Sequence, residues 1–105
     1  MAKLISLIKR KEGMSQEEFA RWAVESHALI GKRMPGIRQY RINVRGADQP
    51  EEEFDGVFEL WFDTAEALKA AFDSPVGAEA RDDAVAHASK RVHLHIEEHV
   101  IVQES

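Results

Sequence analysis

The sequence predicts an α+β domain with the ferredoxin-like order βαββαβ, in which one antiparallel sheet carries helices on one face. Three observations support this fold class. Segments with a two-residue apolar period alternate with segments of helical period. A capping pair and a proline mark the two ends of the first helix. Finally, 105 residues without a repeat or a linker suffice for a single domain only, which we assign to residues 1–105.

The first half of the domain is predicted to be a strand followed by a long helix. The apolar run 4–8 lies between two lysines and is typical of a strand that is buried on both faces. Ser15 and Glu18 have the spacing of a capping box, and the helix that they start should reach about residue 33. Pro35 ends it, because proline cannot continue the hydrogen-bond ladder. One stripe of this helix should face the core: Phe19, Trp22, Ala23, Ser26 and Ile30.

Two strands joined by a polar, acidic loop come next. Residues 37–44 alternate polar and apolar side chains, and residues 56–62 carry large apolar side chains on both faces. Helices cover only one face of such a sheet, so we expect a second copy of the chain to cover the other face. The pattern therefore predicts a homo-oligomer, with a homodimer as the simplest form, in which the sheets of two copies pack face to face. A monomer with an exposed apolar sheet face is the alternative, and exposed patches of that size are uncommon in monomers.

The chain is predicted to end with a second helical region and a fourth strand. Thr64 caps a helix that Ser74-Pro75 interrupts, and a further helical segment is expected over 76–88. Alternation predicts the last strand over 93–102. Its polar row, which we expect in solvent or at a dimer contact, consists of His93, His95, Glu97 and His99. We expect no metal there, because neighbouring positions on one face of a strand lie about 7 Å apart and only two usually share one ion.

Composition and charge argue against several kinds of partner. The chain has no cysteine, which excludes disulfides and thiolate chemistry. A formal net charge of −5 argues against nucleic acid and anionic membranes, because phosphates attract excess lysine and arginine. An RNA-recognition domain has the same element order, but Asp55, Glu59 and Asp63 would lie where phosphate binds. No apolar run approaches the roughly 20 residues of a membrane-spanning helix, and no signal-peptide pattern is present, so we expect a cytoplasmic protein.

Three segments resemble the EthD family. They are the residues Phe19, Trp22, His27-Ala28, Pro35-Gly36 and Tyr40, the stretch 54–63, and the stretch 98–100. Together these segments extend over nearly the whole chain. The resemblance implies a dimeric α+β barrel with a ligand in an apolar cavity between the sheet and the helices, and it implies neither a metal nor a cofactor. It does not fix a reaction, because related families include isomerases, dehydratases, decarboxylases and cofactor-free monooxygenases.

His27 is the candidate catalytic residue. At about 100° per residue it lies about 40° around the helix from Ala23, at the edge of the buried stripe. A neutral imidazole there can take up and return a proton near neutral pH, which suits enolisation, isomerisation or dehydration. It also matches the helix histidine of the family. The alternative is a structural histidine that binds a carbonyl group or water, and the residues alone leave both interpretations open.

The candidates for substrate binding are Trp22, Tyr40, Trp61 and Glu98. An apolar pocket needs aromatic walls and a few polar groups, and the hydroxyl of Tyr40 can orient a ligand. Core packing is the alternative for aromatic residues, and it is the preferred interpretation of Phe58 and Phe72. Glu98 is a charged residue with apolar neighbours. It is either paired or solvated, which we expect, or held as an acid or base with a raised pKa.

Two classes of function follow from these candidates. The first is a cofactor-free isomerase, dehydratase or accessory catabolic enzyme that acts on a small hydrophobic or aromatic carbonyl compound, with His27 as acid and base. The second is a non-catalytic binder or carrier of such a compound, or a stress-type protein of the same barrel shape. A heme-handling or quinol-oxidising protein is a third possibility, and no residue selects it. We expect the first class.

Overall fold

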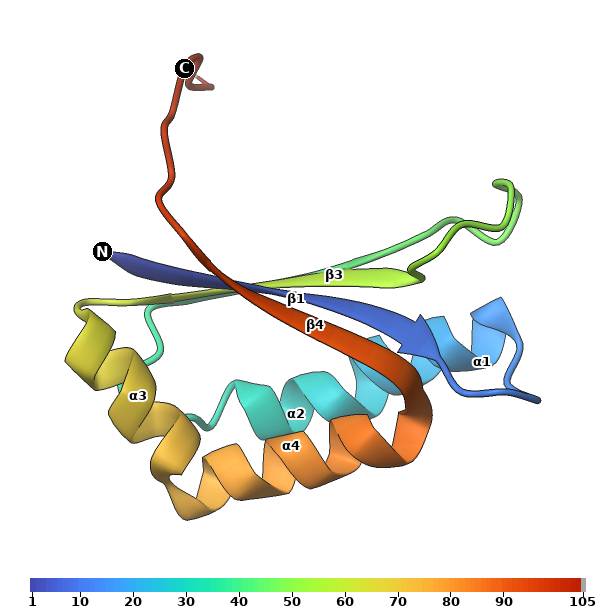
Figure 1. Ribbon diagram of the computed structural model, residues 1–105, viewed down its shortest axis with the longest axis horizontal. Helices are drawn as coiled ribbons and strands as arrows, with labels where there is room; N and C mark the ends of the chain where they lie inside the picture. Colours follow the sequence, from blue (N-terminus) through green and yellow to red (C-terminus); the bar gives the residue numbers. More distant parts are fainter. Residues whose placement is uncertain (105) are drawn as a thin grey trace.

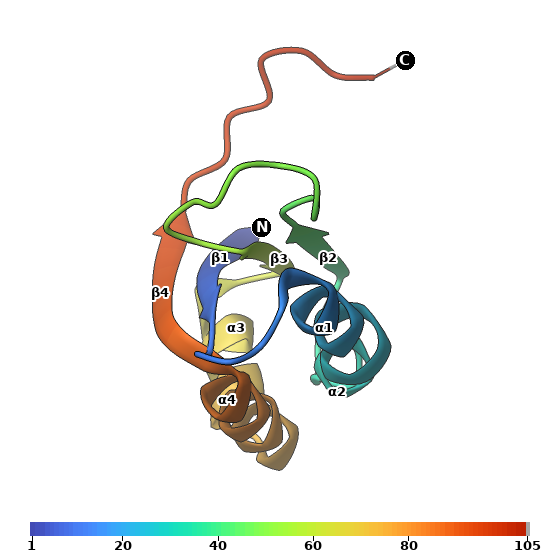
Figure 2. The same ribbon diagram turned by 90° about the vertical axis from the view of Figure 1, so that its right-hand side faces the viewer.

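The computed structural model describes residues 1–104 and has the predicted order of elements. These are β1 (Ala2–Arg10), α1 (Gln16–Arg21), η1 (Trp22–His27), α2 (Ala28–Gly31), β2 (Gln39–Val44), β3 (Gly56–Phe62), α3 (Ala65–Asp73), α4 (Pro75–His87) and β4 (Ala88–Ile96). The strands form an antiparallel sheet in the order β2-β3-β1-β4, and the helices lie on one side of it (Figures 1 and 2). This arrangement confirms the ferredoxin-like fold. Within residues 1–104, no helix has the length and apolar character needed to cross a membrane.

Capping side chains confirm where the predicted helices begin. The hydroxyl of Ser15 accepts a hydrogen bond from the backbone N–H of Glu18 at 3.1 Å, and the Glu18 carboxylate accepts one from the N–H of Ser15 at 2.9 Å. The hydroxyl groups of Thr64 and Ser74 accept hydrogen bonds from the N–H groups of Ala67 and Gly77 at the starts of α3 and α4. Pro75 then occupies the start of α4, where a backbone N–H would have no hydrogen-bond partner within the helix, so its absence costs nothing. Each cap satisfies an amide that a helix end leaves free.

The register of the strands sorts their side chains onto two faces of the sheet. Ser6 pairs with Phe58 on one side and with His93 on the other, and successive residues alternate. The helix-facing side chains of the two central strands join Phe19, Trp22 and Leu68 in the core. On the outer face the neighbouring apolar side chains are Ile5, Leu7, Val57, Val92 and Leu94. We call these five residues the outer apolar face.

The last strand lies earlier in the chain than predicted. β4 spans Ala88–Ile96 rather than 93–102, and residues 97–104 leave the sheet and extend away from it (Figure 1). The pairing with its neighbour β1 sets this limit, because it runs from Arg10 opposite Ala88 to Lys3 opposite Ile96. The direction of the polar row also differs from the prediction. His93 and His95 lie on the helix side of the sheet, opposite Ser6 and Leu4.

The first helix departs from its predicted pattern in its middle part. There η1 is π-helical, and His27 rather than Ser26 is buried. In an α-helix, residues five apart differ by about 140° around the axis. Hydrogen bonds that run from i to i+5 bring such residues to nearly the same face. The rings of Trp22 and His27 therefore lie against each other with centroids 4.9 Å apart, and His27 is only 7% exposed.

Candidate functional site

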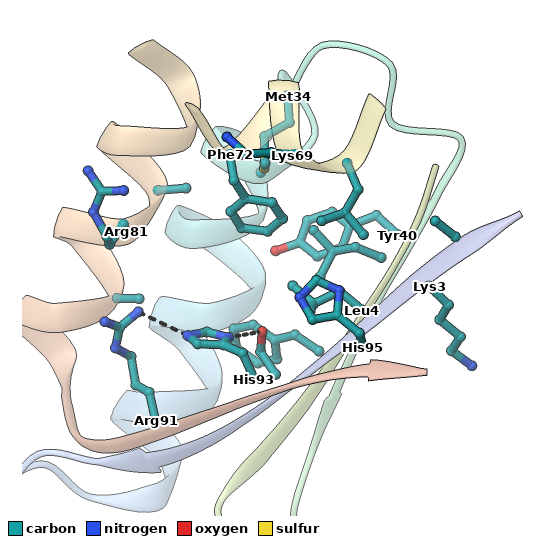
Figure 3. Close-up of a pocket in the computed structure, with 18 of the residues that line it drawn as sticks. Lys3, Leu4, Met34, Tyr40, Lys69, Phe72, Arg81, Arg91, His93 and His95 are labelled. Atoms are coloured by element: carbon teal, nitrogen blue, oxygen red, sulfur yellow. Dashed lines mark hydrogen bonds between the residues drawn. The ribbon is translucent and has the colours of Figure 1, made fainter. Parts of the chain in front are cut away.

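A cavity of about 790 Å³ lies between the sheet and the helices. Apolar side chains form its interior: Leu4, Met34, Phe58, Leu60, Leu68 and Phe72. His27 and Tyr40 line it, and Arg91, His93 and His95 line it from β4 (Figure 3). Its volume is in the range of about 300–1,000 Å³ that small-molecule sites occupy. This cavity is the candidate binding site, and it lies where the family resemblance implied one.

Asp83 on α4 holds His27 in place. Nδ1 of His27 lies 2.9 Å from Oδ2 of Asp83, and the same oxygen accepts a hydrogen bond from Nε1 of Trp22 at 3.1 Å. A carboxylate only accepts, so His27 carries its proton on Nδ1 and leaves Nε2 as the basic nitrogen. Burial lowers the pKa of His27, and the hydrogen bond and charge of Asp83 offset this only in part. The imidazole is therefore neutral at pH 7.

Trp22 packs against the ring of His27 and does not line the cavity. Its ring packs against those of His27 and His87, with centroid distances of 4.9 and 4.6 Å. Together with Asp83 it fixes both the plane and the tautomer of the imidazole. The structure thus brings Trp22 to the candidate site, but as a positioning residue and not as a wall of the cavity.

Tyr40 lies in the cavity wall against Gly31 of α2. A Cβ atom on Gly31 would lie 2.6 Å from Cε2 and 2.8 Å from the hydroxyl oxygen of Tyr40, so only glycine leaves room for this ring. Burial and the negative charge of Asp83 raise the pKa of Tyr40. Its hydroxyl therefore stays protonated near neutral pH and is available as a hydrogen-bond donor.

Gly31→Ala is expected to lower the free energy of unfolding by about 1 kcal/mol. Helix propensity alone would raise this free energy by about 1 kcal/mol, but forcing a methyl group into the Tyr40 ring costs about 1–3 kcal/mol. Urea denaturation of the purified variant measures the difference. The double variant Gly31→Ala/Tyr40→Leu is the control, because the smaller side chain removes the clash and should recover part of the loss. A single variant more stable than the parent protein would contradict the prediction.

The structure places Trp61 and Glu98 on the outer face of the sheet, away from His27. The Glu98 carboxylate accepts hydrogen bonds from Nε1 of Trp61 at 3.2 Å and from Nζ of Lys3 at 2.7 Å. Lys3 also pairs with Glu59 at 2.9 Å, and its ammonium group lies 4.3 Å from the centroid of the Trp61 ring. The hydrogen bonds from Lys3 and Trp61 lower the pKa of Glu98. These two candidates therefore do not join the cavity, and Glu98 is paired as expected.

The polar row of β4, which consists of Arg91, His93 and His95, belongs to the candidate site, although the sequence did not predict this. Nδ1 of His93 lies 2.7 Å from the hydroxyl oxygen of Ser6, and Nε2 of His93 lies 3.4 Å from a guanidinium nitrogen of Arg91 (Figure 3). Partial burial, together with the positive charge of Arg91 and the neighbouring His95, lowers the pKa of His93. Ser6 was the available signal, as the one polar residue in the apolar run 4–8. Among residues 1–104, no three His, Cys, Asp or Glu side chains gather in a way that could hold a metal ion.

Comparison with known proteins identifies the family. The model of the EthD domain matches residues 11–90. The chain belongs to the EthD family. The crystal structure of an EthD family protein from Bacillus halodurans is 27% identical to this EthD protein, with a TM-score of 0.80 over 94% of this chain and 99% of that one. No curated protein matches the chain in sequence.

Two other solved structures share the fold at low identity. A dimeric ferredoxin-like protein from Thermobifida fusca is 13% identical, with a TM-score of 0.72 over 90% of this chain and 88% of that one. SnoaB, a cofactor-independent oxygenase from Streptomyces nogalater, is also 13% identical, with a TM-score of 0.69 over 98% of this chain and 97% of that one. At these identities the likeness establishes the fold and nothing further.

Proposed function

We propose that this EthD protein is a cofactor-free enzyme that moves a proton on a small hydrophobic or aromatic carbonyl compound, as an isomerase or a dehydratase does. One observation carries the proposal. His27 is a neutral imidazole in the wall of an apolar cavity, and Asp83 binds its Nδ1 at 2.9 Å. This arrangement leaves Nε2 as a positioned base, which is the requirement for general acid–base catalysis.

The chemistry proceeds through an enol or enolate. Nε2 of His27 takes a proton from the carbon next to the carbonyl group, and the electron pair of that C–H bond moves onto the carbonyl oxygen. The protonated hydroxyl of Tyr40 donates a hydrogen bond to this oxygen and stabilises its charge. Asp83 stabilises the imidazolium that forms. The imidazolium then returns the proton to another carbon in an isomerisation, or to a departing hydroxyl group in a dehydration.

A proton-exchange experiment tests this proposal without knowledge of the natural substrate. The methyl protons of 2-acetylnaphthalene are acidified by its carbonyl group, so a positioned base exchanges them for deuterium in D₂O. Proton NMR follows their loss with and without the protein, and calorimetry measures binding of the same ketone. We expect protein-catalysed exchange. A carrier would bind the ketone without accelerating exchange, and that result would reject the enzyme in favour of the second class of function.

We further propose that two copies of the chain associate through the outer apolar face. Leu94 on this face is 44% exposed, and the apolar side chains of β1, β3 and β4 adjoin one another across the sheet. Pairing two such faces removes them from water, which drives association. A native mass spectrum at micromolar concentration should give a mass near twice 11.9 kDa. A single-chain mass would reject the dimer, and Leu94→Lys should convert a dimer to monomers by placing like charges in the contact.

A further inference from the structure

The mouth of the cavity is cationic on the side formed by β4 and α4. Arg91 lies on β4 in the same row as His93, and Arg81 lies on α4. Figure 3 shows both guanidinium groups on one side of the cavity, whereas Phe72 and Tyr40 lie on the other side. The register explains this polarity. Across the sheet, Leu4 lies between Leu60 and His95, and Ile8 between Gly56 and Arg91, so the basic side chains enter from the edge strand β4, and Ser6 is the polar residue that β1 adds between them.

These two arginines differ from the other charged residues at the cavity. Lys69 and Asp73 also line it, but they pair with each other at 2.6 Å, and Lys3 pairs with Glu59 and Glu98. Within residues 1–104, no carboxylate forms an ion pair with Arg81 or Arg91. By contrast, the arginines that pair with carboxylates elsewhere in the molecule are Arg10, Arg33, Arg38 and Arg45. Two guanidinium groups without an ion pair therefore lie beside one cavity, in a chain whose net charge is −5.

His93 and Ser6 hold Arg91 toward the cavity. Arginine only donates hydrogen bonds, so Nε2 of His93 is the acceptor in its 3.4 Å contact with Arg91. The proton of the neutral imidazole then lies on Nδ1, which donates to the hydroxyl oxygen of Ser6 at 2.7 Å. Ser6 is itself buried in the central strand β1. A series of hydrogen bonds from Ser6 through His93 therefore orients the guanidinium group of Arg91, which forms no ion pair with a carboxylate of the described residues.

We propose that the ligand carries a carboxylate, which Arg91 and Arg81 bind at the mouth while its apolar skeleton fills the cavity. This inference rests on the proposed function, because the bound carboxylate positions the carbonyl carbon of the ligand for His27. A planar guanidinium matches a carboxylate through two parallel hydrogen bonds. A phosphate would fit less well, since the cavity lining has no glycine-rich loop whose backbone N–H groups could surround it. The substrate class is thus a small apolar keto acid or a related carboxylic acid.

A matched pair of probes tests this inference on the 105-residue protein. 2-Naphthoate and 2-acetylnaphthalene share one aromatic skeleton, and only the first is an anion. Calorimetry should show that Arg91→Gln weakens the binding of 2-naphthoate about tenfold, as expected for a lost charge-assisted hydrogen bond at a partly exposed site. Binding of 2-acetylnaphthalene should stay unchanged. Arg81→Gln should act in the same direction, and Arg91→Lys should restore part of the affinity because it keeps the charge.

Arg21→Gln is the matched control, because Arg21 is exposed on α1 and does not line the cavity. It should leave both affinities unchanged. If 2-naphthoate binds equally well to the parent protein, Arg91→Gln and Arg81→Gln, the carboxylate inference is wrong, while binding and exchange of the ketone would still support the proposed function. The same conclusion follows if only the ketone binds. If neither compound binds, the proposed function falls together with the inference. If Arg91→Gln fails to fold, Arg81→Gln decides.

Discussion

His27→Gln is expected to slow the deuterium exchange of 2-acetylnaphthalene by about 10²- to 10⁴-fold, the usual contribution of a general base. Glutamine has a similar length, and its amide can still donate a hydrogen bond to Asp83, but it has no basic nitrogen. The affinity for the ketone should therefore change by less than about threefold, or roughly 0.7 kcal/mol. Proton NMR gives the exchange rate, and calorimetry gives the affinity.

His99→Gln is the control for this substitution, because His99 is 68% exposed in the segment that leaves the sheet. It should leave the exchange rate unchanged. A His27→Gln protein that exchanges the methyl protons at the parent rate would assign the base to another group and would make His27 a structural residue. Loss of exchange together with loss of binding would show instead that the substitution had disturbed the cavity.

The pH dependence of exchange gives an independent check on His27. Burial lowers the pKa of His27 below 6.5, and only the neutral imidazole acts as a base. The rate should therefore be constant above about pH 7 and fall as the pH drops through a midpoint below 6.5. Asp83→Asn removes the charge that stabilises the imidazolium, so it should lower both this midpoint and the maximal rate. A midpoint above 6.5 would contradict the neutral, buried imidazole.

The fold was predictable because each of its elements leaves a local signal. Polar and apolar side chains alternate along β2, β3 is a short apolar run, Ser15 and Thr64 have the spacing of caps, and Ser74-Pro75 separates the last two helices. The end of β4 was not predictable in this way. Alternation continues past Ile96, but a strand ends where its neighbour ends, and the neighbour lies more than 90 residues away along the chain. The burial of His27 in place of Ser26 was not predictable either, because no local sequence signal indicates the π-helical turn η1.

The site was predictable in its residue types and less so in its assembly. His27 and Tyr40 were selected as candidates, and both line the cavity. Asp83 was missed, because an aspartate in a helix of polar character is usually solvated, and its partner His27 lies 56 positions away. Trp61 was assigned to the same site because β3 carries aromatic side chains on both faces. Which face meets the helices depends on the packing of the whole sheet, so alternation in a single strand does not decide it.

Asp55 is a second residue whose role depends on contacts far away in sequence. It follows the acidic loop and was expected to be part of it, yet its side chain is fully buried. Its carboxylate pairs with Arg10 at 2.7 Å and with Arg45 at 3.1 Å, and it accepts a hydrogen bond from the backbone N–H of Arg10 at 2.9 Å. These contacts fasten the end of β1 to the start of β3, beside the wall of the cavity.

Asp55→Ala is expected to lower the free energy of unfolding by about 3 kcal/mol, the low end of the range for a broken buried pair, because Glu51 still pairs with Arg10 at 2.7 Å and with Arg45 at 3.5 Å. Urea denaturation at fixed protein concentration measures the loss as a lower midpoint with an unchanged slope. Asp48→Ala is the control, since Asp48 is exposed in the same loop, and its effect should stay within about 0.5 kcal/mol. An effect of Asp55→Ala below about 1 kcal/mol would show that the pairs only offset the cost of burying their charges.

The same carboxylate gives the folded protein a defined sensitivity to acid. Burial alone would raise the pKa of Asp55, but the hydrogen bonds from Arg10 and Arg45 and the nearby positive charges outweigh it, so the pKa lies below the ordinary value of 3.8. A carboxylate with a lowered pKa in the folded state stabilises the fold fully above its unfolded pKa, and this contribution disappears as the pH falls through the folded value. The difference in stability between the parent protein and Asp55→Ala should therefore be constant from about pH 5 to 7 and shrink below pH 3.8. A difference that stayed constant down to pH 2 would show that the lost packing of the side chain, and not its charge, accounts for the effect.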